Sequence, residues 1–200
     1  MSKKFGRTPQ QVRIIGGQWK RTPLPVPELE GLRPTPDRVR ETVFNWIEHL
    51  KAGDWKRLAC LDLFAGTGVL GFEAASRGAV KVVLVESHPA ALSQLAAIRE
   101  KLQAEQVTVL RGDAMRHMAS MAGKFNLIFL DPPYQLQLLP QLLPLCRRLL
   151  EQDGLVYIEN DQPFDSEFRP DWLKGWKIIR ASKAGVVNYG LLALDDLIPN

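Results

Sequence analysis

The sequence predicts a doubly wound α/β fold with a mostly parallel sheet of seven strands. From Arg57 onward, short apolar runs alternate with amphipathic helical segments, which is the pattern of repeated β-α units. A glycine-rich turn joins the first apolar run to the first helix of this region. Two apolar runs around residues 183–185 end the region as a hairpin, so an antiparallel strand is expected at one side of the sheet.

The individual elements follow from their apolar periodicity and from glycine and proline boundaries. The predicted strands are 58–64, 80–86, 106–110, 125–130, 155–159, 176–181 and 186–194. Helices are predicted from the glycine turn to residue 77 and over 89–102, 114–121 and 136–150, the last interrupted near Pro140 and Pro144.

A small extension precedes this sheet. Residues 12–24 predict a hairpin that turns at Gly16-Gly17 and returns through residues 18–21, followed by an extended proline connector. Thr35 is predicted to cap a helix that has Pro36 at its first position and runs to about Leu50. We therefore divide the chain into an extension, residues 1–52, and a main domain, residues 53–200. Trp19 has two open roles, stacking on a base or covering the core.

The positive charge is concentrated in that extension. Residues 1–40 hold nine Lys and Arg against three acids, whereas the rest of the chain holds 17 basic and 19 acidic residues. Such an asymmetry predicts that the extension contacts a polyanion. The candidate contacts are Arg13, Lys20, Arg21, Arg33, Thr35, Arg38 and Arg40.

Composition predicts a cytoplasmic protein without a membrane segment. No apolar run reaches transmembrane length, and no apolar stretch follows the basic residues at the start. Cys60 and Cys146 lie in apolar runs and are expected to be buried thiols. The histidines and cysteines have no metal-ligand spacing, so no metal is expected.

The glycine turn predicts a nucleotide-like cofactor. Gly66, Gly68 and Gly71 match the pattern G-x-G-x-x-G, and Glu86 ends the next strand at a spacing that suits a ribose contact. The same pattern is typical of nicotinamide and flavin enzymes. Asp62 argues against a pyrophosphate, because a carboxylate at the end of the first strand suits an ammonium group instead. A ligand with a ribose, an adenine and an amino-acid tail is S-adenosylmethionine.

Further cofactor contacts are expected at the ends of the neighbouring strands. Asp113 follows the third strand, where it can accept a hydrogen bond from the adenine amino group or cap the next helix, and one residue can do both. The remaining expected cofactor contacts are Phe64, Thr67 and Ala114.

The sequence Asp131-Pro132-Pro133-Tyr134 predicts the acceptor site. It follows the buried strand 125–130, and ligands of open α/β sheets bind beyond the carboxyl ends of the strands. The two prolines stiffen the turn. A carboxylate, a fixed carbonyl oxygen and an aromatic ring then suit a planar base that carries an exocyclic amino group. A plain strand-to-loop turn, in which Asp131 caps backbone amides, is the alternative.

Together these residues resemble the class I S-adenosylmethionine-dependent methyltransferases that methylate amino groups. The motifs occur in that family's order and spacing. The segments 13–17 (RIIGG) and 33–46 (RPTPDRVRETVFNW) are more specific and resemble the RsmD family, the bacterial small-subunit rRNA guanine-N2 methyltransferases. The resemblance covers nearly the whole chain and weakens after about residue 160. Tyr134 stands where some relatives carry Phe.

The resemblance implies a Rossmann-like methyltransferase sheet and transfer of a methyl group to the N2 amine of a guanine in 16S rRNA. The substrate would be an assembling small subunit, the enzyme a monomer and the product S-adenosylhomocysteine. Asp131 and the Pro132 carbonyl would accept the two amino N–H bonds, and Tyr134 would stack on the base. The alternatives are an N6-adenine methyltransferase, a protein-glutamine methyltransferase, a dehydrogenase and a non-catalytic RNA-binding protein.

Overall fold

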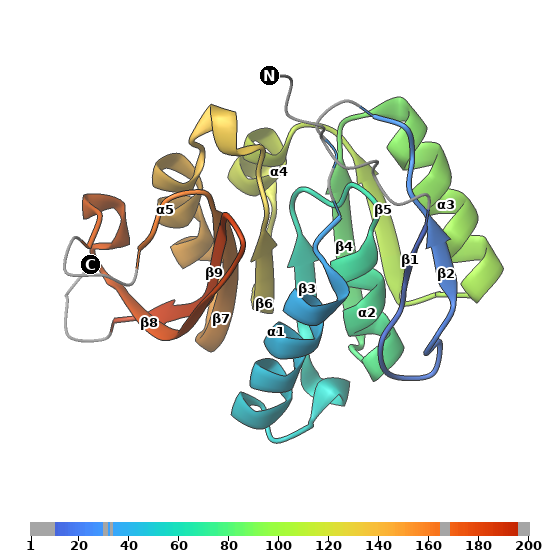
Figure 1. The fold of residues 1–200 in the computed structure, drawn as a ribbon, viewed down its shortest axis with the longest axis horizontal. Helices are drawn as coiled ribbons and strands as arrows, with labels where there is room; N and C mark the ends of the chain where they lie inside the picture. Colours follow the sequence, from blue (N-terminus) through green and yellow to red (C-terminus); the bar gives the residue numbers. More distant parts are fainter. Residues whose placement is uncertain (1–10, 30–31, 33, 165–168, 196–200) are drawn as a thin grey trace.

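The computed structural model describes residues 11–29, 32, 34–164 and 169–195 of the chain. Its centre is a seven-stranded sheet in the order β5-β4-β3-β6-β7-β9-β8 (Figure 1). The strands are β3 (Ala59–Asp62), β4 (Lys81–Glu86), β5 (Val107–Arg111), β6 (Phe125–Leu130), β7 (Leu150–Asn160), β8 (Trp176–Ala184) and β9 (Val187–Leu194).

The sheet is mostly parallel, as the sequence predicts. Neighbouring strands from β5 to β7 pair in parallel, and β9 runs antiparallel to β7 and β8. The antiparallel strand therefore lies one position inside the edge. Strand β7 is longer than predicted, because it begins directly after the preceding helix at Leu150.

Helices cover both faces of the sheet in a three-layer arrangement (Figure 1). Successive strand residues alternate between the two faces, so that Leu127 and Phe129 join one apolar cluster and Ile128 and Leu130 the other. The first cluster includes residues of α1 (Asp37–Leu50), α2 (Val69–Arg77) and α3 (Pro89–Leu102), and the second those of α4 (Ala114–Ser120) and α5 (Leu139–Leu149). Short 3-10 helices lie at η1 (Trp55–Arg57), η2 (Tyr134–Leu136) and η3 (Asp171–Leu173). Both cysteines are buried thiols, as predicted.

Local signals fix the boundaries of α2. Gly68 precedes the helix with φ +75° and Gly78 ends it with φ +114°, values that residues with a Cβ rarely adopt. At Gly68 a Cβ would also lie 2.4 Å from the Leu95 side chain. The glycine turn is thus both conformationally required and closely packed against α3.

The N-terminal hairpin is present, but its second strand comes later than predicted. Strand β1 (Gln11–Arg13) pairs with β2 (Pro23–Pro25), and residues 16–21 form the connecting turn. Prolines are tolerated in β2 because the structure pairs it on one side alone. The hairpin lies beside α3 (Figure 1), and no helix in the described parts of the chain is long and apolar enough to span a membrane.

Candidate active site

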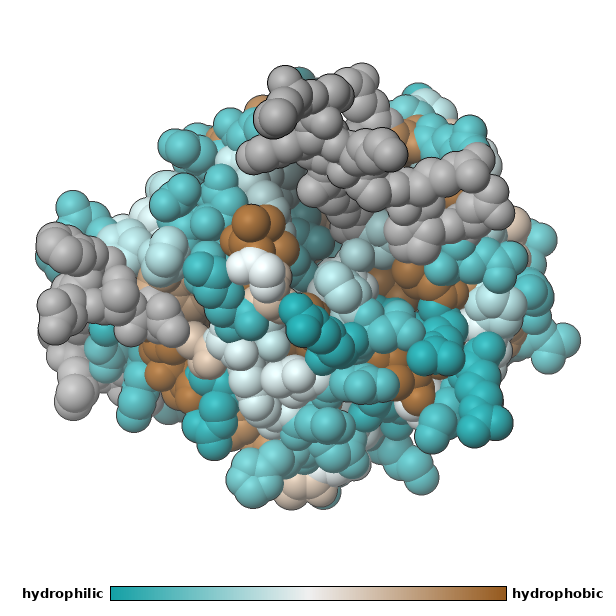
Figure 2. Space-filling model, in the orientation of Figure 1, coloured by the Kyte–Doolittle hydropathy of each residue, from teal (hydrophilic) through white to brown (hydrophobic). Residues whose placement is uncertain are grey.

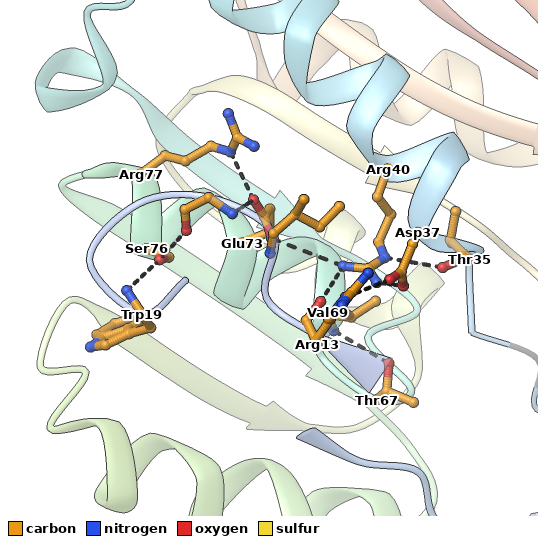
Figure 3. Close-up of polar contacts among 12 residues, drawn as sticks. Arg13, Trp19, Thr35, Asp37, Arg40, Thr67, Val69, Glu73, Ser76 and Arg77 are labelled. Carbon is orange, nitrogen blue, oxygen red and sulfur yellow. Dashed lines mark hydrogen bonds and ion pairs between the residues drawn. The ribbon is translucent and has the colours of Figure 1, made fainter. Parts of the chain in front are cut away.

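A buried glutamate attaches the N-terminal hairpin to the sheet domain (Figure 3). The Glu73 side chain on α2 is fully buried and accepts hydrogen bonds from the backbone N–H groups of Ile15 and Gly16, at 2.6 and 2.8 Å. Two guanidinium groups balance its charge: Arg77 Nε at 2.8 Å and Arg40 Nη1 at 3.9 Å. We call Glu73, Arg40 and Arg77 the Glu73 centre. Asp37, 2.6 Å from Arg40, supplies the second negative charge, so the charges of the centre are compensated within the protein.

Arg40 therefore has a structural role, which corrects the expectation that it contacts RNA. Its side chain is fully buried and donates to the backbone oxygens of Thr35 and Arg13 and to the Asp37 carboxylate. Burial lowers the pKa of Arg40, and the negative charges of Asp37 and Glu73 oppose that shift. The sequence showed a basic residue in a helix but not which side of the helix is buried.

Thr35 also differs from its prediction. Pro36, not Thr35, occupies the cap position of α1, and no side chain caps that helix. The Thr35 hydroxyl instead donates to Glu159 Oε1 at 2.8 Å. Thr35 is 4% exposed, so the expectation of an RNA contact through its side chain is corrected as well.

Other predicted RNA contacts remain at the surface. Arg38, Lys20 and Arg21 are exposed, and the exposed Arg13 pairs with Asp37 at 2.9 Å. Trp19 is partly buried against the core, which favours the covering role, and Arg33 lies outside the described residues. The molecular face in Figure 2 is mostly hydrophilic, with hydrophobic atoms in separate small areas.

Strand β3 ends at Asp62, just before the glycine turn. Asp62 is 3% exposed, and its Oδ2 accepts a hydrogen bond from the Gly71 N–H at 3.2 Å. Burial raises the pKa of Asp62 to about 7, with a further contribution from the negative charge of Glu86, while backbone hydrogen bonds from Gly71 and Phe64 oppose the shift. A cation placed beside Asp62 would restore its ionised form.

Glu86, at the end of β4, contacts the glycine turn through its carboxylate. Its Oε2 accepts from the Gly66 N–H at 2.8 Å, and its Oε1 accepts from the Ser87 and His88 N–H groups. A carboxylate has about four acceptor positions, so one remains on Oε2. A ribose that used both oxygens would have to replace one of these backbone donors.

Asp113 caps α4, as one of its two predicted roles requires. Its Oδ1 accepts from the Arg116 N–H at 3.0 Å, and the residue is exposed. Oδ2 makes no hydrogen bond within the described residues, so the second role stays available. The other expected cofactor contacts, Phe64, Thr67 and Ala114, lie at the ends of β3 and β5, with Thr67 accepting from the Val69 N–H.

Asp131 lies at the same edge of the sheet as the glycine turn. Strand β6 pairs in parallel with β3, with Phe129 opposite Asp62, so Asp131 follows two residues beyond that pair. Shielding from solvent raises the pKa of Asp131 well above its usual range, and the nearby charges of Glu159 and Asp62 raise it further. The Asp131 carboxylate accepts no hydrogen bond from the described residues, and no turn hydrogen bond among them ends on the Pro132 oxygen. Asp131 therefore does not cap backbone amides.

Glu159, which the sequence analysis did not select, is the hydrogen-bonding centre of this corner. It is 3% exposed and accepts from three hydroxyl groups: Thr35 at 2.8 Å, Tyr157 at 2.7 Å and Tyr134 at 3.1 Å. Burial raises the pKa of Tyr134 and Tyr157, which keeps both hydroxyls protonated as donors. The sequence offered one signal for Glu159. It is an acid near the end of a buried strand, two residues after Tyr157, and alternate residues of a strand share a face.

Asp62, Asp131 and Glu159, which we call the acidic corner, lack a positive partner within the described residues. No ion pair there joins any of the three to a Lys or Arg. Buried carboxylates without a counter-charge are costly. These acceptors thus fit a cationic ligand that carries an ammonium or sulfonium group, with Glu86 and Asp113 available as acceptors for a ribose and an adenine.

The chain matches a known protein family and named relatives over most of its length. The family model described as "Conserved hypothetical protein 95" matches residues 12–193. The chain is 39% identical over 183 residues to "Ribosomal RNA small subunit methyltransferase D" of Escherichia coli K12, which covers 90% of this chain and 89% of the relative. The protein of the same name from Haemophilus influenzae is 35% identical over 190 residues, covering 90% and 93%.

A solved structure agrees with the fold. "Putative methyltransferase yhhF from Escherichia coli" superposes with a TM-score of 0.79 at 36% identity. The match covers 92% of this chain and 98% of that protein.

Proposed function

This chain belongs to the "Conserved hypothetical protein 95" family, the RsmD-like methyltransferases, and we propose that it methylates the exocyclic N2 amine of a guanine in small-subunit rRNA. The methyl donor is S-adenosylmethionine. The observation that carries the proposal is the position of Asp131, a carboxylate without hydrogen-bond donors, beside the uncompensated Asp62 at the end of β3.

The residues around the glycine turn would hold the methyl donor. S-adenosylmethionine supplies an electrophilic methyl group on a positively charged sulfur, together with an ammonium group. Asp62 binds the ammonium group, Glu86 accepts from the ribose and Asp113 accepts from the adenine. Ionisation of Asp62 is restored by that positive charge, because the pKa of about 7 reflects burial without a counter-ion.

Asp131 and the Pro132 carbonyl act on the acceptor. The amino nitrogen of guanine is a poor nucleophile because its lone pair is delocalised into the ring. Two acceptors that take its two N–H bonds favour a pyramidal nitrogen, with the lone pair directed at the methyl group. Asp131 also stabilises the positive charge that develops on nitrogen during transfer. Tyr134 stacks on the base, which must leave its own stack to enter the site.

The exposed basic residues of the N-terminal extension would hold the RNA. Arg38 at the start of α1 follows Thr35 by three residues, and Thr35 contacts the acidic corner through Glu159. Arg38 is thus an exposed basic residue close in sequence to the segment that contacts the acidic corner. Together with Lys20 and Arg21 it supplies phosphate contacts that carry affinity without reading sequence.

The experiment that tests this proposal identifies the methylated nucleoside. Small ribosomal subunits from a strain that lacks the protein are incubated with the enzyme and labelled S-adenosylmethionine, digested, and examined by mass spectrometry. We expect label in N2-methylguanosine, with more on subunits than on naked 16S rRNA. Label in N6-methyladenosine would overturn the guanine assignment. Absence of both binding and transfer would favour a non-catalytic RNA-binding role, and binding of a nicotinamide cofactor would favour a dehydrogenase.

A further inference from the structure

Glu159 connects three segments that are distant in the sequence. Three residues donate to it: Thr35, two residues before α1; Tyr134, the first residue of η2; and Tyr157, on the same strand β7. Thr35 and Tyr157 share Oε1, whereas Tyr134 is the one described donor to Oε2. The carboxylate is nearly inaccessible to solvent, so its function lies in these contacts and not in direct binding of a substrate.

We propose that Glu159 is a positioning residue of the transfer site, which fixes the Tyr134 ring for the incoming base through the hydrogen bond to its hydroxyl. This inference rests on the proposed function, because it assigns Tyr134 to the acceptor side. Unlike Tyr157 and Thr35, Tyr134 is only partly buried and belongs to a turn that begins a short 3-10 helix. A ring at such a position needs a second attachment to keep one orientation.

The bond from Tyr134 explains why a tyrosine can be preferable to a phenylalanine here. Both rings can stack on a base, but only the hydroxyl reaches Glu159, at 3.1 Å. Hydrogen bonds to a buried carboxylate are stronger than those between neutral groups. A ring that is already held in the bound orientation loses less conformational freedom when the base arrives, and the complex gains affinity for that reason.

Glu159 also acts on Asp131 through its charge. In register, Ile158 of β7 lies opposite Leu130 of β6, so Glu159 and Asp131 follow that pair side by side. The charged and titratable groups around Asp131 are Glu159 and the Tyr157 hydroxyl on β7, Asp62 on β3 and the Tyr134 hydroxyl after β6. The negative charge of Glu159 makes Asp131 a stronger acceptor for the amino protons than it would be alone.

Two tyrosine variants test the positioning role on the full-length protein. Tyr134→Phe keeps the ring and removes its bond to Glu159, whereas the control Tyr189→Phe removes, from a mostly buried tyrosine, a hydroxyl that makes no hydrogen bond within the described residues. We expect Tyr134→Phe to raise KM for small subunits about tenfold, the loss of one charge-assisted hydrogen bond, while leaving the affinity for S-adenosylmethionine unchanged. Tyr189→Phe should leave both values unchanged.

Glu159→Gln tests the charge separately. Its amide oxygen can still accept from Thr35 and Tyr157, so the fold keeps these contacts. Activity requires ionised Asp131 and falls as the pH drops through the pKa of that group. Removing the charge of Glu159 lowers this pKa, so the acid limb of kcat/KM should move to lower pH by about half a unit or more. If Glu159 had only a structural role, Glu159→Gln would lower Tm without moving the acid limb of kcat/KM.

The outcomes separate this inference from the proposed function. If wild-type protein methylates guanine and Tyr134→Phe matches Tyr189→Phe in KM and kcat, the positioning role is wrong. An unmoved acid limb in folded Glu159→Gln removes the effect on Asp131. If the wild-type protein is inactive, aromatic NMR of tyrosine-labelled protein decides: Tyr134 ring signals should average in Glu159→Leu, which cannot hydrogen-bond to the Tyr134 hydroxyl, and an unchanged ring would overturn the role. If Glu159→Leu does not fold, Tyr134→Phe in phenylalanine-labelled protein replaces it in the NMR comparison, because it removes the same hydrogen bond from the other side.

Discussion

The Glu73 centre and the acidic corner both contain buried carboxylates, Glu73 in the first and Asp62 and Glu159 in the second, but only the first has cations beside them. Glu73 has two guanidinium groups and two backbone N–H groups around it. In the acidic corner, Asp62 accepts from a backbone N–H, Glu159 accepts from hydroxyl groups, and Asp131 accepts no hydrogen bond within the described residues. None of the three has a cation beside it among those residues. The first arrangement is complete in the isolated protein and holds the N-terminal hairpin in place. The second is complete only with a positively charged ligand.

The largest expected effect is on stability at the Glu73 centre. Glu73→Ala removes the buried carboxylate beside Arg77 and the acceptor of two backbone N–H groups, and it leaves Arg40 with Asp37 alone, which should lower the free energy of unfolding by about 3–5 kcal/mol. Chemical denaturation measures this change. The control Asp54→Ala removes an exposed pair with Arg57 and should cost about 0–1 kcal/mol. Equal effects of the two substitutions would contradict the assignment of Glu73 as a structural centre.

The next effect is on catalysis at the acidic corner. Asp131→Ala removes the acceptor for the amino protons, so we expect the single-turnover rate on small subunits to fall about 100- to 1000-fold. The affinity for S-adenosylmethionine, measured by calorimetric titration, should stay within about threefold of the wild-type value. Near-normal turnover in this variant would exclude Asp131 from the reaction.

Removing a carboxylate from the acidic corner should stabilise the ligand-free protein, whereas Glu73→Ala should destabilise it. Asp62 has a pKa of about 7 in the folded protein and about 3.9 when unfolded, so its ionisation opposes folding. This cost is absent below about pH 4 and grows as the pH rises through 7. Asp62→Asn should therefore stabilise the ligand-free protein at pH 8, by up to about 4 kcal/mol, and have little effect near pH 4. Destabilisation at pH 8 would show that Asp62 is already compensated.

The smallest effect concerns the RNA surface. Arg38→Ala should raise KM for small subunits several-fold and reduce the salt dependence of binding by about one counterion, as for a single phosphate contact. Arg57→Ala changes an equally exposed arginine beyond the opposite end of α1 and should leave both quantities unchanged. If the two variants behave alike, Arg38 does not contact the RNA.

The sequence predicted the strands and helices well because their signals are local. The apolar run of β6 and the proline-bounded helix α3 match their predicted bounds. Partners across the chain have no such local signal. Arg40 was assigned to RNA because a basic residue in a helix shows neither its burial nor its distant partner, Glu73. Glu159 was missed although it lies two residues after Tyr157 on the same strand, because its other two donors, Thr35 and Tyr134, lie 124 and 25 residues away along the chain.

The same rule applies to where the predicted site residues lie. Asp131 and Asp62 were predicted at one edge of the sheet because parallel strands place their carboxyl ends together, and the pairing of β3 with β6 agrees with that placement. Thr35 was taken for a helix cap because its sequence neighbours fit that role. In the structure a buried carboxylate is the stronger partner, since it would otherwise lose a hydrogen bond in an environment with little water.

Proton release on binding of S-adenosylmethionine tests the central claim, an acidic corner that awaits a cation, most directly. Calorimetric titrations at pH 7 in two buffers of different ionisation enthalpy measure the number of protons exchanged. A positive ligand beside Asp62 lowers its pKa from about 7, so binding should release protons near neutral pH, and Asp62→Asn should abolish most of that release. Binding without proton release, or release that Asp62→Asn does not change, would contradict the account.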